Sequence, residues 1–273
     1  MFVDLVLARR LEATEGHVGA SYVAARDRTS GAATERFGGI VAVFDGADSP
    51  LTQTFGLGLD GPPALAAIEQ FFTSRGADTL HEVSPFAGVE TVALLATRGY
   101  VPVELSTVLV QPIEDVPMST TLSVRKIDPL RDGETWIATS IAGWSSDPAV
   151  VPFIRSMAEV SLANAAMMHY LVEHEGAPIA TGSMGIHDGI ALLAGASTVP
   201  AARGIGAQSA ILAARLTAAR EYGCSVAMMV TAVGSTSQRN AERRGFRVAY
   251  TRTKWRRSAE PPTLRPDLDK PRT

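Results

Sequence analysis

One stretch constrains the fold more than any other, because an apolar segment runs directly into a glycine-containing turn and then into a helical pattern. Residues 191–198 are apolar or small, as in a buried strand, and residues 199–206 contain a proline, an arginine and two glycines. Helical spacing follows from Gly206 to Glu221. Glycines let a backbone approach a ligand closely, and the start of a helix presents unpaired N–H groups. Arg203 adds a positive charge at this place, so the sequence predicts a phosphate site.

The glycine spacing does not fit two other phosphate-binding motifs. A dinucleotide-binding turn has the pattern G-x-G-x-x-G, but Ser209 occupies the third glycine position. A nucleotide P-loop requires Gly-Lys-Ser/Thr, which this sequence does not contain. A purely structural turn between a strand and a helix remains the alternative interpretation.

With its flanking elements, this stretch resembles the GNAT superfamily of acyltransferases over roughly residues 121–255. Pro200, Arg203 and Gly206 fall in register with the family's loop pattern Arg/Gln-x-x-Gly-x-Gly/Ala, and the family's closing Gly-Phe pair recurs as Gly245-Phe246. The sequence departs from the pattern at Gln208, where the family has Gly or Ala. A glutamine in the first turn of a helix can still donate its backbone N–H to a phosphate.

The resemblance implies an acyl-CoA cosubstrate, in the first place acetyl-CoA. Arg203 and the amides of residues 204–209 would hold its pyrophosphate. The end of the preceding strand would pair with the pantetheine arm, and a strand beginning at Val226 would diverge to open a cleft. The residues expected at the coenzyme are Ala196, Ser197, Thr198, Arg203, Gly204, Ile205, Gly206, Ala207, Gln208, Ser209, Ser237 and Asn240.

The same resemblance leaves the acid and base of the reaction open. Many GNAT members have a tyrosine four residues before the closing glycine, where this chain has Ala241. A thiol has a pKa of about 8.5 and an alkyl ammonium one of about 10.4, so deprotonating an amine is the harder step. Glu173, Glu175 and Asp188 are the nearest carboxylates in sequence, but all are expected at solvated turns. No catalytic residue is therefore assigned.

The first half repeats the order of elements and resembles a degenerate GNAT unit, with Arg98-Gly99-Tyr100 in place of the closing Gly-Phe pair. Its corresponding loop, residues 56–61, has no arginine, and Asp60 would repel a pyrophosphate, so we expect no CoA binding there. The predicted fold is α/β (α+β), with two tandem units that each have a mixed, mostly antiparallel sheet flanked by helices. The expected division is 1–112 and 121–258, with a linker between them and a disordered tail at 259–273.

Three further expectations concern the bounds of individual helices and strands. Gly16 and Gly19 favour two short helices rather than one between residues 4 and 27. Residues 52–59 are expected to form one strand. Asp132 is expected to cap a helix that ends at Ala142.

Composition excludes several classes of protein. A net charge of −3 over 273 residues disfavours nucleic-acid and anionic-membrane partners, and the single cysteine, Cys224, excludes a disulfide framework. No two of the five histidines have the i, i+4 spacing of a zinc site, so no metal is expected. No apolar run approaches the roughly 20 residues of a membrane span, and the expected location is the cytoplasm.

The sequence thus predicts an acyl-CoA-dependent N-acyltransferase that transfers an acetyl group to an amine by direct attack. A non-catalytic acyl-CoA-binding or sensor protein is one alternative, and transfer of an aminoacyl or longer acyl group is another. The acceptor is a small-molecule or peptide amine, and its identity and the oligomeric state stay open.

Overall fold

The strands of this computed structural model, which describes residues 2–113, 122–145 and 147–259, join in one 11-stranded sheet. Its order is β1-β2-β3-β4-β11-β5-β10-β9-β8-β7-β6. The first half contributes α1 (Leu5–Ala24), β1 (Ala33–Phe37), β2 (Ile40–Phe44), β3 (Gln53–Phe55), α2 (Leu65–Thr73), β4 (Thr79–Val83), α3 (Gly88–Thr97) and β5 (Val101–Pro112). The second half contributes β6 (Ser123–Lys126), α4 (Pro129–Trp144), α5 (Val151–Ala163), β7 (Met167–His174), β8 (Ala177–His187), β9 (Ile190–Thr198), α6 (Ala207–Glu221), β10 (Val226–Ala232), α7 (Thr236–Glu242) and β11 (Arg247–Arg257).

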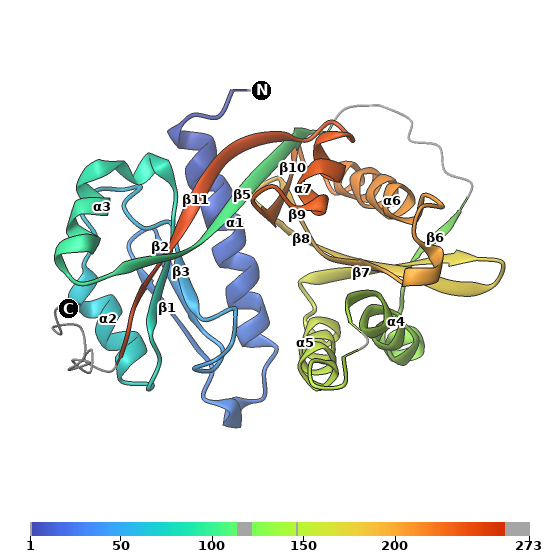
Figure 1. Cartoon of the computed structure of the whole chain (residues 1–273), viewed down its shortest axis with the longest axis horizontal. Coiled ribbons are helices and arrows are strands. Elements are labelled where there is room, and N and C mark those ends of the chain that lie inside the picture. Colours follow the sequence, from blue (N-terminus) through green and yellow to red (C-terminus); the bar gives the residue numbers. More distant parts are fainter. Residues whose placement is uncertain (1, 114–121, 146, 260–273) are drawn as a thin grey trace, which may run out of the picture.

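Helices cover both faces of this sheet. The apolar residues of α6 pack with Leu109 and Ala227 on one face. Those of α1 pack with Val108, Val110 and Met228, which point to the other face because side chains alternate along a strand. In Figure 1, α1 runs between the group of α2 and α3 and the group of α4 to α7. The predicted α/β class with a mixed, mostly antiparallel sheet is confirmed.

The prediction of two short helices at the start of the chain is wrong, because α1 is one uninterrupted helix. Its glycines serve close packing instead of ending the helix. A Cβ added at Gly16 would lie 3.0 Å from the Cβ of Val41, and one at Gly19 would lie 3.3 Å from a methyl carbon of Val43. The missing side chains therefore let α1 lie directly on β2.

Two other local predictions are corrected. β3 ends at Phe55 and not at Leu59, because Gly56 and Gly58 have positive φ angles of 81° and 75° that turn the chain out of the strand. Asp128, and not Asp132, caps α4, because the Asp128 side chain accepts a hydrogen bond from the Leu130 N–H. The helix ends at Trp144 and not at Ala142. The Asp132 carboxylate accepts from the Asp128 N–H and pairs with Arg125.

The last strands of the two halves exchange places in the sheet. β5, from the first half, pairs with β10 of the second half along Ser106–Pro112. β11, from the second half, lies between β4 and β5 and pairs with both. Figure 1 shows β5 and β11 crossing the middle of the molecule side by side. Each half therefore completes its sheet with a strand of the other half. The predicted linker falls mainly within residues 114–121, and the predicted tail within 260–273, which are outside the described residues.

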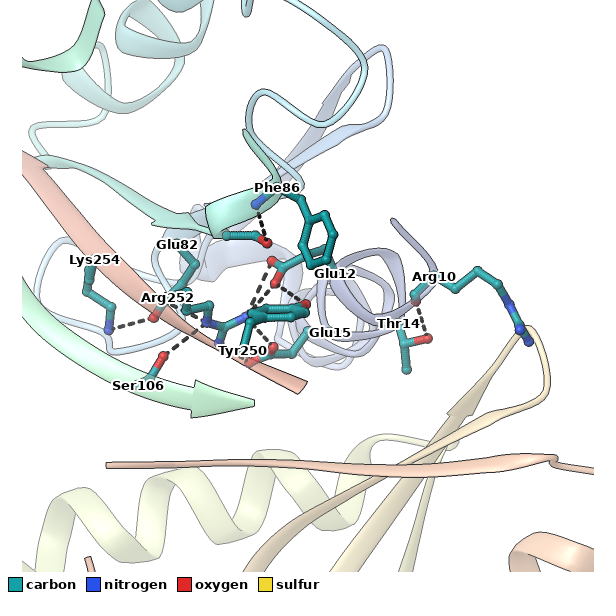
Figure 2. A network of polar contacts seen from close by, with 11 residues as sticks. Arg10, Glu12, Thr14, Glu15, Glu82, Phe86, Ser106, Tyr250, Arg252 and Lys254 are labelled. Carbon is teal, nitrogen blue, oxygen red and sulfur yellow. Dashed lines mark hydrogen bonds and ion pairs between the residues drawn. The ribbon is translucent and has the colours of Figure 1, made fainter. Parts of the chain in front are cut away.

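A buried ionic cluster joins the exchanged strand β11 to the first half (Figure 2). The Arg252 side chain, only 2% exposed, lies between Glu12 and Glu15 of α1 and Glu82 of β4. Its nearest ion-pair distances to them are 3.2, 2.6 and 2.9 Å. Burial raises the pKa of Glu12, although the positive charge of Arg252 acts to lower it. The Tyr250 hydroxyl donates a hydrogen bond to the Glu12 carboxylate. Glu12 and Glu15 thus depend on Arg252, whereas Glu82 also pairs with Lys254 of β11 at 3.3 Å.

A buried histidine should make the stability of the first half depend on pH. His81 bonds to the Thr54 hydroxyl at 2.6 Å and to the Tyr100 hydroxyl at 3.0 Å, and burial lowers its pKa to about 3. The unfolded chain has a histidine pKa of about 6.5, so its unfolded form takes up the proton first as the pH falls. The stability contributed by neutral His81 is therefore complete above pH 6.5 and is lost progressively toward pH 3.

Urea unfolding at pH 7.5 and pH 5 measures this effect. We expect the free energy of unfolding to fall by about 2 kcal/mol from His81 alone, and the variant His81→Gln to lose correspondingly less. His174→Gln is the control, because His174 is exposed at the end of a hairpin. Equal losses in wild type and His81→Gln would contradict the prediction.

Candidate functional site

β9 and β10 separate after a short parallel stretch. They pair only at Val226–Ile190, Ala227–Ala191 and Met228–Leu192, and β10 then continues along β5 as far as Ala232. β9 continues along β8 to Thr198. The predicted divergence of the strand at Val226 is confirmed, and residues 193–198 of β9 form a strand edge that β10 does not cover.

A β-bulge lies within this edge. Thr181 pairs with Ser197 and Ser183 pairs with Ala194, so Gly195 and Ala196 together oppose the single residue Gly182. Gly195 has a φ of 59° and is exposed. A bulge of this kind turns the backbone groups of the strand out of their regular directions, and such bulges are common next to active sites.

The glycine-containing loop joins the end of β9 to α6. Gly204 and Gly206 have φ angles of 88° and 96°, and a Cβ added at either would meet no other described atom within 4 Å. Gly206 is the N-cap of α6 and provides no side-chain cap. Among the described residues, the amides of 204–208 donate to no recorded acceptor. The loop is thus an open cradle of N–H groups at a positive helix end, which fits a phosphate.

The predicted side chains lie around this cradle. Arg203 is exposed, and its guanidinium makes long contacts of 3.4 Å to the carbonyl oxygens of Thr198 and Gly143. The amide of Gln208 donates to the Thr198 hydroxyl at 2.6 Å. Ser197 is buried, and its hydroxyl bonds to that of Thr181 at 2.9 Å. The loop and the end of β9 therefore come together as predicted, with Ser197 available to a ligand only through its backbone.

Comparison with known proteins agrees with this geometry at the level of the fold. No protein-family model and no curated sequence matches the chain. Among solved structures, a GCN5-related N-acetyltransferase from Kribbella flavida superposes with a TM-score of 0.62 at 17% identity, covering 89% of this chain and 95% of its own. A tandem GNAT protein from the clavulanic acid biosynthesis pathway superposes with a TM-score of 0.51 at 15% identity, covering 67% of this chain and 65% of its own.

The chain has the GNAT fold. Identities this low establish the fold alone, so the chemistry of this chain has to be argued from its own residues.

Ser237 and Asn240 lie on α7, which follows β10 in this GNAT fold and packs against β10, β5 and β11. Both are exposed, and because α7 contacts β10, β5 and β11, they lie on the β10 side of the divergence, whereas the loop follows β9. Ala241, in the place of the family tyrosine, is buried and packs in the cluster that contains Phe246. No side chain at this position can therefore act as an acid.

Of the three carboxylates considered as bases, Glu175 and Asp188 lie at turns as expected, but Glu173 lies within β7, between β6 and β8, and is half-buried. Glu173 pairs with Arg125, and Asp188 pairs with Arg10 at 2.7 Å. Glu175 lies between β7 and β8 with a φ of 51°. In the described part of the chain, no group of three or more His, Cys, Asp or Glu side chains is arranged so that it could hold a metal ion, and no helix is long and apolar enough to cross a bilayer.

The corresponding loop of the first half is packed closed. Leu57 and Leu59 are buried, and a Cβ added at Gly58 would lie within 3.0 Å of Ala87 and Thr91. Arg9 pairs with Asp60 at 2.7 Å and donates to the carbonyl oxygen of Leu59. The Arg9 guanidinium is thus engaged with the Leu59 carbonyl oxygen and the Asp60 carboxylate of this loop.

Arg215 of α6 is a residue that the sequence analysis missed. Only 3% exposed, it donates to the carbonyl oxygens of Ser183 and Ala194 beside the bulge, at 3.0 and 3.3 Å. Burial lowers its pKa to about 10. The signal was available in the sequence: Arg215 lies four residues after Ile211 and four before Ala219, on the apolar face of the helix.

Proposed function

We propose that this protein is an acyl-CoA-dependent N-acyltransferase that transfers an acetyl group from acetyl-CoA to an amine. The observation that carries the proposal is the open cradle of amides at 204–208, beside Arg203 and next to the uncovered edge of β9. A diphosphate would bind to the amides and to the guanidinium, and an extended pantetheine arm would pair with residues 196–198 as an added strand.

In this reaction the amine nitrogen forms a bond to the thioester carbonyl carbon, the C–S bond breaks, and CoA leaves as a thiolate. The amine gives up its proton to water, and the thiolate takes one from solvent. The protein's part is to hold the thioester against β9, where a backbone N–H can stabilise negative charge on the carbonyl oxygen. Because a thiolate is a tolerable leaving group, the reaction does not need the acid that Ala241 has replaced.

The two halves take different roles in this proposal. The second half, residues 121–258, binds acetyl-CoA, and the first half, residues 1–112, is a degenerate unit that supplies β5 and supports the sheet. The loop at residues 56–61 supports this division, because its leucines are buried in the core and Asp60 pairs with Arg9.

A non-catalytic acyl-CoA-binding protein is a second candidate, favoured by the buried Ala241 in the place of an acid. A thiol-release assay with acetyl-CoA and a panel of primary amines separates the two. Amine-dependent release supports the enzyme, whereas tight binding without release for any amine supports the sensor.

Removing the positive charge of the cradle should weaken coenzyme binding. We expect Arg203→Ala to raise the Kd for acetyl-CoA about 10-fold to 100-fold in calorimetry, because a charge-assisted hydrogen bond contributes roughly 1.5–3 kcal/mol. Arg9→Ala is the matched control, because this change removes the arginine beside the corresponding loop of the first half. The Kd of the Arg9→Ala variant for acetyl-CoA should equal that of the wild type. An unchanged Kd in Arg203→Ala would refute the assignment of the cradle.

A further inference from the structure

Arg215 is a cation buried without an anion. Its guanidinium lies between α6 and the sheet, and its recorded partners are the carbonyl oxygens of Ile211, Ser183 and Ala194. Within the described residues no carboxylate forms an ion pair with it. Burying an unpaired charge is costly, and a methionine of similar length would fill the same space without that cost. Packing alone therefore does not explain why an arginine occupies position 215.

The guanidinium lies directly beside the β9 bulge. Gly182 is the residue opposite the bulge, and a Cβ added there would lie 3.3 Å from both the Cζ and the Nη1 of Arg215. The absence of a side chain at Gly182 thus makes room for Ile211, whose Cδ1 would lie 2.9 Å from that Cβ, and for the guanidinium beside it. The same Nη1 contacts Ser183 on β8 and Ala194 on β9, so one group ties the two strands together where their regular pairing is interrupted.

The contact with Ala194 also affects the next N–H group. The carbonyl of Ala194 and the N–H of Gly195 belong to one peptide unit, and in a trans peptide they point in opposite directions. No described peptide bond is cis. Because the carbonyl oxygen points at Arg215, the Gly195 N–H points away from α6. A cation bound to the oxygen also polarises the peptide and makes its N–H a stronger donor.

We propose that Arg215 is a positioning residue that fixes the β9 bulge and polarises the Ala194–Gly195 peptide, so that the Gly195 N–H stabilises the thioester oxygen. This inference rests on the proposed function, because it requires an acyl-CoA thioester against β9. Its new element is the role of Arg215, which gives a reason for a buried charge on α6.

The experiment measures the thioester directly and needs no acceptor. Acetyl-CoA carrying ¹³C at the acetyl carbonyl is bound to wild type and to Arg215→Met, Arg215→Lys and Arg220→Met, and the carbonyl resonance is recorded free and bound. A strong hydrogen bond to the oxygen moves this resonance downfield. Arg220→Met is the control, because Arg220 is exposed on the same helix. Calorimetry gives the Kd of each variant for acetyl-CoA and for 3′-phospho-ADP, which contains the diphosphate but not the thioester.

We expect a downfield shift in wild type and in Arg220→Met, a smaller one in Arg215→Lys, and none in Arg215→Met. The Kd for 3′-phospho-ADP should stay the same in all four proteins. With a productive amine, kcat of Arg215→Met should fall between about 10-fold and 100-fold with little change in KM, a smaller loss than removal of an oxyanion donor causes.

The same downfield shift in every folded Arg215 variant would overturn the inference while leaving the proposed function intact. If Arg215→Met does not fold, Arg215→Lys decides, and a shift equal to that of wild type overturns the inference. A wild type that binds neither acetyl-CoA nor 3′-phospho-ADP refutes the proposed function itself, and the inference with it.

Discussion

Cutting the chain between its halves should not separate them. If residues 115–120 are replaced by a protease recognition sequence and the chain is then cleaved, we expect both fragments to elute together in size exclusion and to unfold in one transition. The physical reason is the strand exchange: β11 pairs with both β4 and β5, and β5 pairs with β10, so separation would break three ladders. Acetyl-CoA binding should survive the cut.

The corresponding control is the second half expressed alone, as residues 122–259. It lacks β5, so β10 and β11 have no strand between them, and their edges are left unpaired. We expect this fragment to aggregate and to bind no acetyl-CoA. Fragments of the cleaved chain that elute separately and remain folded would show that the exchange does not hold the halves together.

Replacing Arg252 should strongly destabilise the protein. The change Arg252→Met leaves Glu12 and Glu15 close together without their shared cation and leaves Glu82 with Lys254 alone, so the free energy of unfolding should fall by about 3–5 kcal/mol at pH 7. Burial already raises the pKa of Glu12. A carboxyl with a higher pKa in the folded state takes up a proton on folding, so the variant should recover part of its stability as the pH falls.

Urea unfolding of matched variants checks this expectation. Arg256→Met is the control on the same strand, because that side chain is half exposed and lies 3.9 Å from Asp78, and it should cost less than about 1 kcal/mol. Adding Glu12→Gln and Glu15→Gln to Arg252→Met should restore part of the loss by removing the uncompensated charges. Equal stability of the Arg252 and Arg256 variants would contradict a structural role for the cluster.

Apart from the ends of α4, the sequence predicted the local elements of the second half well, because their signals are local. The turn at residues 199–206 contains its glycines and arginine within eight positions, and the divergence after Met228 follows from the fold that this turn indicates. The α6 helix begins one residue from its predicted start.

Long-range packing could not be predicted in the same way. Gly16 resembles a helix breaker in sequence, and only the contact with Val41 shows that it allows α1 to approach the sheet. The exchange of β5 and β11 leaves no local trace, since both strands have the same pattern whether they pair within their own half or across the molecule. Arg215 was detectable as a charge on an apolar helix face, but its role depends on a bulge in another strand.

The position of β11 also has a consequence for synthesis. The chain leaves the ribosome from its N-terminus, so β4 and β5 are made long before the strand that belongs between them. Until residues 247–257 emerge, both strands expose unpaired edges, and nascent chains with such edges are prone to aggregate. Neither half can complete its sheet before the other, so the two halves fold on the ribosome as a single unit.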